Sequence, residues 1–336
     1  MITLISATIR EKTRPNKQPY LHQLQAAYGR LFLFAQTFWL MMITPMRTIL
    51  CLSFFVCGLG ADEPRVNRGI LPGGMIDDKK LLSELNSHAK QLRNVDDAPK
   101  AAELLKQLSR KQCQLTLQIP GEKKLTTTEI AQRTRKGVLV VSGLYKCKRC
   151  PNWHSSAASG FMLTEDGAFC TSYHVVDNPQ NDSIVIMTGD GRVAPVMEVL
   201  AADKRTDLAI LRAKGKGFTP LPVSVNPLDS PIGDKVHVFS HPNRHFYVLS
   251  EGIISRKYLD STRKEGPRRM ISITADFAKG SSGAPVFNEY GAVIASVNNT
   301  QSTYYSVKKD GTKDNLQMVF KNTVSLEHLR TLIKAK

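Results

Sequence analysis

The chain has 336 residues, 46 of them Lys or Arg against 29 Asp or Glu, which gives a formal net charge of +17. The hydrophobic share of 42% excludes a chain that is disordered throughout, and the length allows one large domain or two small ones. A basic surface favours anionic surroundings, such as the membrane or an anionic envelope polymer. No nucleic-acid-binding motif accompanies the charge, so we expect no specific nucleic-acid partner.

The first segment, residues 1–61, has the character of a leader. Met46-Arg47 provides a start and a basic region, residues 49–56 are apolar, and small residues close the segment at 58–61. This pattern predicts a signal peptide over residues 46–61, with Met46 as the initiator, and hence a periplasmic or extracellular protein. The alternative is a membrane anchor formed by residues 31–60, although Pro45 and Arg47 divide that stretch into short runs.

Residues 62–128 are polar, with leucines at helical spacing near positions 81–85 and 104–108. We expect a helical extension that acts mainly as a solvated spacer. Its last part, residues 118–128, contains Pro120, Gly121 and three threonines and is typical of a linker.

Residues 129–336 form the main domain, in which short β-rich runs alternate with turns. The predicted strands are 138–141, 160–163, 184–187, 193–200, 208–211, 236–239, 247–255, 270–274, 292–297 and 317–320. Turn residues such as Gly167 and Gly191 separate neighbouring runs. An all-β domain is therefore expected, closed by a C-terminal helix over residues 325–334.

Three segments of this domain carry residues that suit nucleophilic catalysis. His174 follows a β-rich run, Asp207 immediately precedes an apolar strand, and Ser282 lies in a glycine-flanked loop. Each alone has an ordinary structural explanation: a core histidine, a turn aspartate or a flexible loop. The order His, Asp, Ser within one β-rich domain instead favours a catalytic triad.

The sequence runs that carry these residues are SGFMLTEDGAFCTSYHVV, ADKRTDLAILRA and ITADFAKGSSGAPVFNEYGAVIASV. With IGDKVHVFSHP and LSEGIISR, they resemble successive blocks of the trypsin-like serine peptidases, and most closely the bacterial Deg/HtrA-like branch. The resemblance covers residues 129–320. It implies a chymotrypsin-like fold of two six-stranded antiparallel β-barrels, here with a helical N-terminal extension and the C-terminal helix.

The resemblance also implies a serine endopeptidase that needs no cofactor and hydrolyses a protein or peptide substrate through an acyl-enzyme intermediate. Ser282 is the expected nucleophile, His174 the base, and Asp207 the group that orients the imidazole. The backbone N–H groups of Gly280 and Ser282 are expected to form the oxyanion hole. The alternative is a catalytically idle module of the same fold that binds peptides or envelope components.

Several positions depart from the family pattern. Ser281 stands where zymogen-type enzymes have an aspartate, so we expect no activation by cleavage, and Ala284 replaces a glycine. No PDZ domain is expected after the barrels. Asp276 falls where trypsin-like enzymes place the base of the specificity pocket, but an ordinary polar loop residue is the alternative.

A cysteine motif lies outside these blocks. Cys147, Cys150 and His154 have the spacing of ligands for structural zinc, which binds four ligands, and Cys113 is the expected fourth. A disulfide between Cys147 and Cys150, or free thiols in a plain hairpin, are the alternatives.

Overall fold

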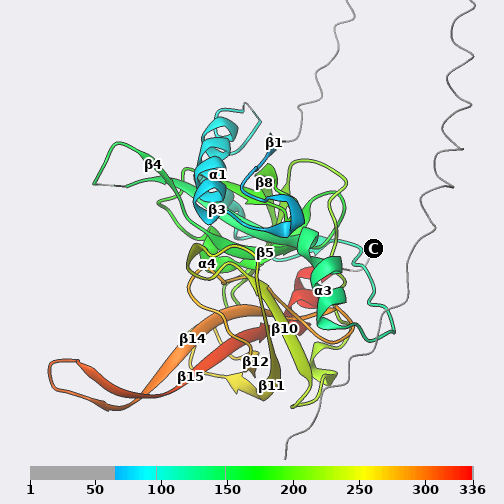
Figure 1. Cartoon of the computed structure of the whole chain (residues 1–336), viewed down its shortest axis with the longest axis vertical. Helices are drawn as coiled ribbons and strands as arrows, with labels where there is room; N and C mark the ends of the chain where they lie inside the picture. The colour runs from blue at the N-terminus through cyan, green and yellow to red at the C-terminus, as the bar shows by residue number, and fades with distance from the viewer. Residues whose placement is uncertain (1–64, 96, 148, 335–336) are drawn as a thin grey trace, which may run out of the picture. The chain divides into compact units, whose positions relative to one another are not determined.

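The computed structural model describes residues 65–95, 97–147 and 149–334 (Figure 1). The predicted signal peptide at 46–61 and the alternative anchor at 31–60 both lie outside the described residues. Among the residues that are described, no helix combines the length and the apolar character needed to cross a bilayer.

Six antiparallel strands close the first barrel in the order β8-β7-β3-β5-β6-β9, with β9 returning to β8. Their bounds are β3 Val138–Lys146, β5 Ala158–Met162, β6 Ala168–Ser172, β7 Ser183–Met187, β8 Arg192–Asp203 and β9 Leu208–Ala213. The interior is apolar because the inward positions are aliphatic or aromatic, and Val140, Phe161 and Ile210 are fully buried. The short strand β4, Trp153–Ser155, pairs with the end of β3.

The second barrel also has six strands, closed in the order β10-β11-β12-β15-β14-β13. Their bounds are β10 Lys235–Ser240, β11 Val248–Asp260, β12 Arg268–Ile273, β13 Pro285–Phe287, β14 Val293–Val307 and β15 Lys313–Ser325. The far halves of β14 and β15 project from this barrel as a two-stranded hairpin, drawn in orange and red in Figure 1. These two barrels confirm the predicted all-β fold.

The N-terminal extension differs from the expected solvated spacer, because it is packed against the first barrel. Its elements are β1 Arg65–Val66, α1 Asp78–Leu92, α2 Ala101–Gln107 and β2 Cys113–Gln114. Strand β1 pairs with β8, and Leu81, Leu85 and Leu104 are completely buried. The leucine spacing therefore marks a face that the barrel covers, and the described residues all belong to one compact unit.

The expected linker at 118–128 ends in a helix. Helix α3, Thr127–Thr134, begins with a capping box in which Thr126 and Glu129 bond each other's backbone N–H groups. At the other end of the domain, the predicted C-terminal helix is α5, Glu327–Leu332, shorter than expected. It ends because β16, Ile333–Lys334, pairs in parallel with β2.

The remaining helical segments are short. They are α4 Tyr173–Val176 and the 3-10 turns η1 Pro72–Gly74, η2 Arg135–Gly137, η3 Pro227–Asp229 and η4 Pro242–Arg244. Helix α4 carries His174 directly after β6, so the barrel fixes the backbone position of this histidine.

Candidate active site

His174 and Asp207 come from neighbouring strands of the first barrel. His174 follows β6 and Asp207 immediately precedes β9, and these two strands are paired along their length. The imidazole Nδ1 lies 2.8 Å from Asp207 Oδ2 and 3.1 Å from Oδ1. The backbone N–H of His174 also donates to Asp207 Oδ1, at 3.0 Å. The carboxylate therefore fixes both the ring and the main chain of the histidine.

The Asp207 carboxylate is nearly closed off from solvent, with 8% of its side chain exposed. Its backbone adopts a φ of 59°, in the left-handed region that an aspartate seldom occupies, so surrounding contacts must hold it there. One such contact comes from the second barrel, where Asn298 Nδ2 donates to Asp207 Oδ2 at 2.6 Å.

A buried arginine decides which way the Asn298 amide faces. Arg268 Nη2 donates to Asn298 Oδ1 at 3.1 Å, and an arginine side chain can only donate. The amide nitrogen must then face Asp207. Arg268 is itself held by Asp260, at 3.1 Å, with only 3% of its side chain exposed. Neither Asn298 nor Arg268 was predicted from the sequence, which offers no local motif for them.

The bond to Asp207 also affects the acid strength of the histidine. The hydrogen bond that His174 donates to Asp207 raises the pKa of the histidine above its ordinary value of 6.5, against the opposing effect of desolvation. The His174 side chain remains 53% exposed, so its Nε2 side is accessible. Since Nδ1 is engaged by the carboxylate, Nε2 is the nitrogen available for proton transfer.

Ser282 lies at the tight turn that precedes β13. Its carbonyl accepts from the N–H of Ser159 in β5 at 3.0 Å, which attaches the serine loop to the first barrel. A Cβ atom on the next residue, Gly283, would lie 2.4 Å from the Ser159 carbonyl oxygen and 2.8 Å from the backbone nitrogen of Ser172. Only glycine permits this approach, which brings the Ser282 loop beside the segment that carries His174.

No hydrogen bond joins Ser282 to His174 within the residues that the structure describes. His174 and Asp207 are thus joined by a direct hydrogen bond, whereas the loop of Ser282 is attached to the first barrel through Ser159. Nucleophile and base often lie further apart in a free enzyme than in its complex with substrate.

Gly280 shapes the loop before the serine. Its φ is 98°, and a Cβ atom there would lie 2.6 Å from the His241 carbonyl oxygen. The Lys279 carbonyl accepts from Asn243 N–H at 2.6 Å, so the trans peptide directs the Gly280 N–H the opposite way. In the described part of the chain, neither this N–H nor that of Ser282 donates to a protein acceptor.

Ser281 faces the interior. It is completely buried, and its hydroxyl donates to Ser240 Oγ at 3.0 Å. The two adjacent serines are therefore distinct: Ser282 is half-buried at the surface, whereas Ser281 is a structural hydrogen-bond donor. Where zymogen-type enzymes have an aspartate, this chain has an internally satisfied hydroxyl.

His241, a neighbour of this loop, is not a competing base. It is fully buried, and burial lowers its pKa to about 3. Its Nδ1 accepts from the Tyr247 N–H at 3.0 Å. The ring is neutral and has a structural role below the serine loop.

Asp276 lies at the surface rather than at the base of a pocket. Its side chain is 87% exposed and pairs with Lys321 Nζ at 3.2 Å. The same ammonium donates to the Phe277 carbonyl at 2.7 Å. This placement favours the ordinary loop residue over a site that attracts basic substrate side chains.

Three of the four expected metal ligands come together. Cys147 Sγ lies 3.1 Å from Cys150 Sγ, which lies 3.0 Å from His154 Nε2. Cys113 is not part of this cluster: it belongs to β2, where pairing with β16 places its thiol 3.5 Å from the Leu332 carbonyl oxygen.

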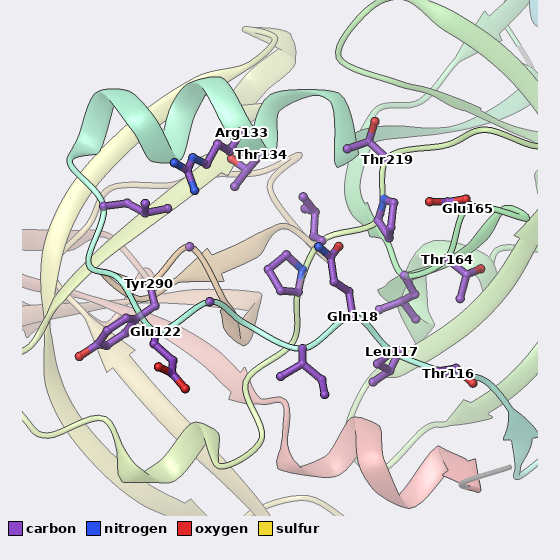
Figure 2. Close-up of a pocket in the computed structure, with 18 of the residues that line it drawn as sticks. Thr116, Leu117, Gln118, Glu122, Arg133, Thr134, Thr164, Glu165, Thr219 and Tyr290 are labelled. Carbon is purple, nitrogen blue, oxygen red and sulfur yellow. The ribbon is translucent and has the colours of Figure 1, made fainter.

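A cavity of about 670 Å³ lies near α3 (Figure 2). Segment 116–125 lines one side of it, with Arg133, Thr164 and Tyr290 from other elements. None of His174, Asp207 and Ser282 lines this cavity, so it is separate from the candidate active site.

Part of the chain is similar to known serine peptidases. Residues 158–295 match the model of the trypsin-like peptidase domain. The chain is 28% identical over 137 residues to the serine endoprotease DegS of Salmonella typhimurium, covering 40% of this chain and 37% of that protein. It is 32% identical over 143 residues to a probable periplasmic serine endoprotease, DegP-like, of Halomonas elongata, covering 41% and 28%.

The chain thus spans well under half the length of these curated relatives. A solved structure of the HtrA-type protease AlgW with a tripeptide is 20% identical, over 62% of this chain and 64% of that chain, with a TM-score of 0.48. The match to the trypsin-like peptidase domain begins in the first closed barrel and ends in the second, so this similarity involves both barrels.

Proposed function

We propose that this trypsin-like domain is a serine endopeptidase that uses Ser282, His174 and Asp207. Ser282 Oγ attacks the scissile carbonyl while His174 Nε2 accepts its proton, which gives a tetrahedral intermediate. When the intermediate collapses to an acyl-enzyme, the proton passes to the leaving amine. Water then repeats the sequence in the second half-reaction and releases the free carboxylic acid and Ser282.

The observation that carries the proposal is the bond of 2.8 Å between His174 Nδ1 and Asp207 Oδ2. It holds the tautomer with the proton on Nδ1, leaving the lone pair of Nε2 to act as base. It also stabilises the imidazolium that forms when the serine is deprotonated.

The oxyanion hole is proposed to consist of the Gly280 and Ser282 N–H groups. Both donors belong to a loop held by Asn243 and Ser159, and no protein group competes for them in the described residues. Donors fixed before the reaction stabilise the developing negative charge without reorganisation, and one such donor contributes about 10²–10³-fold to kcat in comparable sites.

The second candidate is a catalytically idle module of the same fold that binds peptides. The absence of a Ser282–His174 hydrogen bond in the described residues is the observation in its favour. The intact His174–Asp207 pair favours the enzyme, because a binding module has no need of an oriented imidazole.

A fluorophosphonate probe, which labels only activated serines, distinguishes the two. We expect wild-type protein to be labelled and Ser282→Ala to be unlabelled, with peptide hydrolysis reduced by about 10⁴-fold or more. Ser281→Ala is the matched control: it removes a buried hydroxyl and should cost about 1 kcal/mol of stability while keeping the label. Well-folded wild-type protein that takes up no probe would support the binding module instead.

The proposed substrate is a protein or peptide, and the proposed location is outside the cytoplasm. The name of the DegP-like relative describes a periplasmic protease, which supports export. The net charge of +17 supports contact with an anionic envelope or membrane surface. Fractionation of cells that produce the full chain tests the location.

A further inference from the structure

We propose that Cys147, Cys150 and His154 bind one zinc ion, which fixes the β3–β4 turn against helix α1. This site is independent of the peptidase mechanism. The three side chains offer two sulfur atoms and one imidazole nitrogen, all within 4.8 Å of one another. Thiolate and imidazole donors are the combination that zinc prefers in proteins.

The hairpin explains why these residues converge. Cys147 follows the last residue of β3, and His154 lies in β4, where it pairs with Tyr145. The intervening turn contains Cys150, so both cysteines and the histidine meet at one end of a two-stranded ladder. Pairs of cysteines separated by two residues at a turn are typical of structural zinc sites.

The histidine argues against a simple disulfide. A bond between Cys147 and Cys150 would use both sulfur atoms and leave the imidazole without a role, yet His154 Nε2 lies 3.0 Å from Cys150 Sγ. Both thiols are free in the structure. Three donors that face a common point are better explained by a shared cation.

Only three protein ligands meet in the described residues, so the fourth position of the zinc is assigned to water. All three side chains are half-buried, and His154 also lines a cavity of about 250 Å³ beside Lys79 and Asn86. Solvent can thus reach the cluster. Three protein ligands with water in the fourth position is the tetrahedral arrangement of catalytic zinc sites, and two cysteines with one histidine is one of the ligand sets found in them. The proposed site is therefore more open than the four-ligand structural site expected from the sequence.

The consequence of the metal is to hold β4 against the N-terminal extension. Asn86 of α1 donates to the Trp153 carbonyl at 3.2 Å and accepts from Ser155 Oγ at 3.1 Å. Arg93, the residue that follows α1, has its guanidinium carbon 4.4 Å from the centre of the Trp153 ring. Trp153 and Ser155, which these α1-side residues contact, are the immediate neighbours of His154. A metal that orders His154 therefore also orders the surface on which α1 docks.

Binding requires no oxidant. Zn²⁺ replaces the thiol protons of Cys147 and Cys150, which pass to the buffer, and the neutral imidazole donates its Nε2 lone pair. The sulfur atoms remain reduced throughout.

The test uses the full chain, reduced, stripped of metal with a chelator and titrated with Zn²⁺. We expect one zinc per chain by elemental analysis and a rise in Tm of about 5 °C with excess zinc. Cys150→Ser and His154→Asn should weaken binding by more than about 10-fold, because even residues behind the ligands contribute 10–100-fold in known sites. Cys113→Ser, which changes a half-buried cysteine outside the cluster, should bind zinc like wild type.

Co²⁺ provides a second readout that does not depend on variant stability. We expect wild type and Cys113→Ser to give intense visible bands of tetrahedral cobalt and a sulfur-to-cobalt charge-transfer band. Failure of the reduced wild type to bind either metal, or equal zinc binding by Cys150→Ser and wild type, would overturn the proposal. So would a native Cys147–Cys150 disulfide whose reduction does not create zinc binding.

Discussion

The two barrels contribute to the site in different ways. The first delivers His174 and Asp207 already bonded to each other, from adjacent paired strands. The second delivers Ser282 on a loop whose geometry depends on glycine, and its bond to the base is absent from the described residues. Strand pairing in the first barrel brings His174 and Asp207 together, and Asn298 of the second barrel adds one donor to Asp207. Placement of Ser282 instead depends on the backbone shape of its loop.

The segments added to the two barrels also differ, in how much of their apolar surface is buried. The extension that covers the first barrel buries its leucines in the shared core. The β14–β15 hairpin of the second barrel instead leaves Tyr305 and Met318 exposed, at 79% and 54%. The extension therefore adds buried apolar contacts to the first barrel, whereas the hairpin of the second barrel exposes apolar side chains to solvent.

The largest effect that tests this comparison is expected for Gly280→Ala. The new methyl group would meet the His241 carbonyl oxygen, so the loop must shift and move an oxyanion donor. We expect kcat/KM to fall by about 10²–10³-fold. Gly311→Ala is the matched control, since its φ of 83° is also positive but no atom lies within 4 Å of the new Cβ. Unchanged activity of Gly280→Ala would mean that loop shape does not place the nucleophile.

Leu85→Ala tests whether the extension belongs to the first barrel. The side chain is fully buried in α1, so its truncation should lower the free energy of unfolding by about 3 kcal/mol in chemical denaturation. Met75→Ala, at a side chain that is 68% exposed, should change it by less than about 0.5 kcal/mol. Equal free energies of unfolding for the two variants would mean that the extension is a solvated spacer, as its composition suggested.

Asn298→Ala removes the contribution of the second barrel to the base. Asp207 would lose a donor at 2.6 Å, and Arg268 would lose one of its two acceptors while keeping Asp260. We expect kcat/KM to fall about tenfold, the effect of losing one hydrogen bond to a charged group. Asn299→Ala is the control, because Asn299 bonds Asn322 and does not contact the triad. If both variants keep wild-type activity, strand pairing in the first barrel alone orients the base.

The smallest expected effect is a shift in the pH profile. Asp207 raises the pKa of His174, and only the neutral imidazole accepts a proton, so the acid limb of kcat/KM should have its midpoint above 6.5. Activity therefore falls as pH drops through the raised pKa. Asp207→Asn should move the midpoint down. A wild-type midpoint at or below 6.5 would contradict the bonded pair.

The same shift acts on stability with the opposite sign. A histidine whose pKa is raised on folding favours the folded state while it is protonated. This contribution is complete below its unfolded pKa and is lost as pH rises through the raised value. Denaturation of wild type and Asp207→Asn on both sides of this range measures the difference.

The sequence predicted the fold and singled out three candidate catalytic residues, because both inferences depend on local patterns. Alternating apolar runs marked most strands, and glycine-flanked motifs marked Ser282. Asn298 and Arg268 could not be predicted, since their partner Asp207 is 91 residues from Asn298 and meets it only when the barrels pack. Leucine spacing likewise predicted α1 but not the surface that covers it, and cysteine spacing could not show that β2 pairs with β16 and removes Cys113 from the cluster.

The Arg268–Asn298–Asp207 chain has a consequence for biosynthesis. Asp207 belongs to the half of the domain that leaves the ribosome first, and Asn298 to the half that follows. A partly synthesised chain with a folded first barrel would therefore contain an incompletely restrained base and no nucleophile. In the proposed peptidase, hydrolysis therefore requires both halves of the domain to be folded and docked.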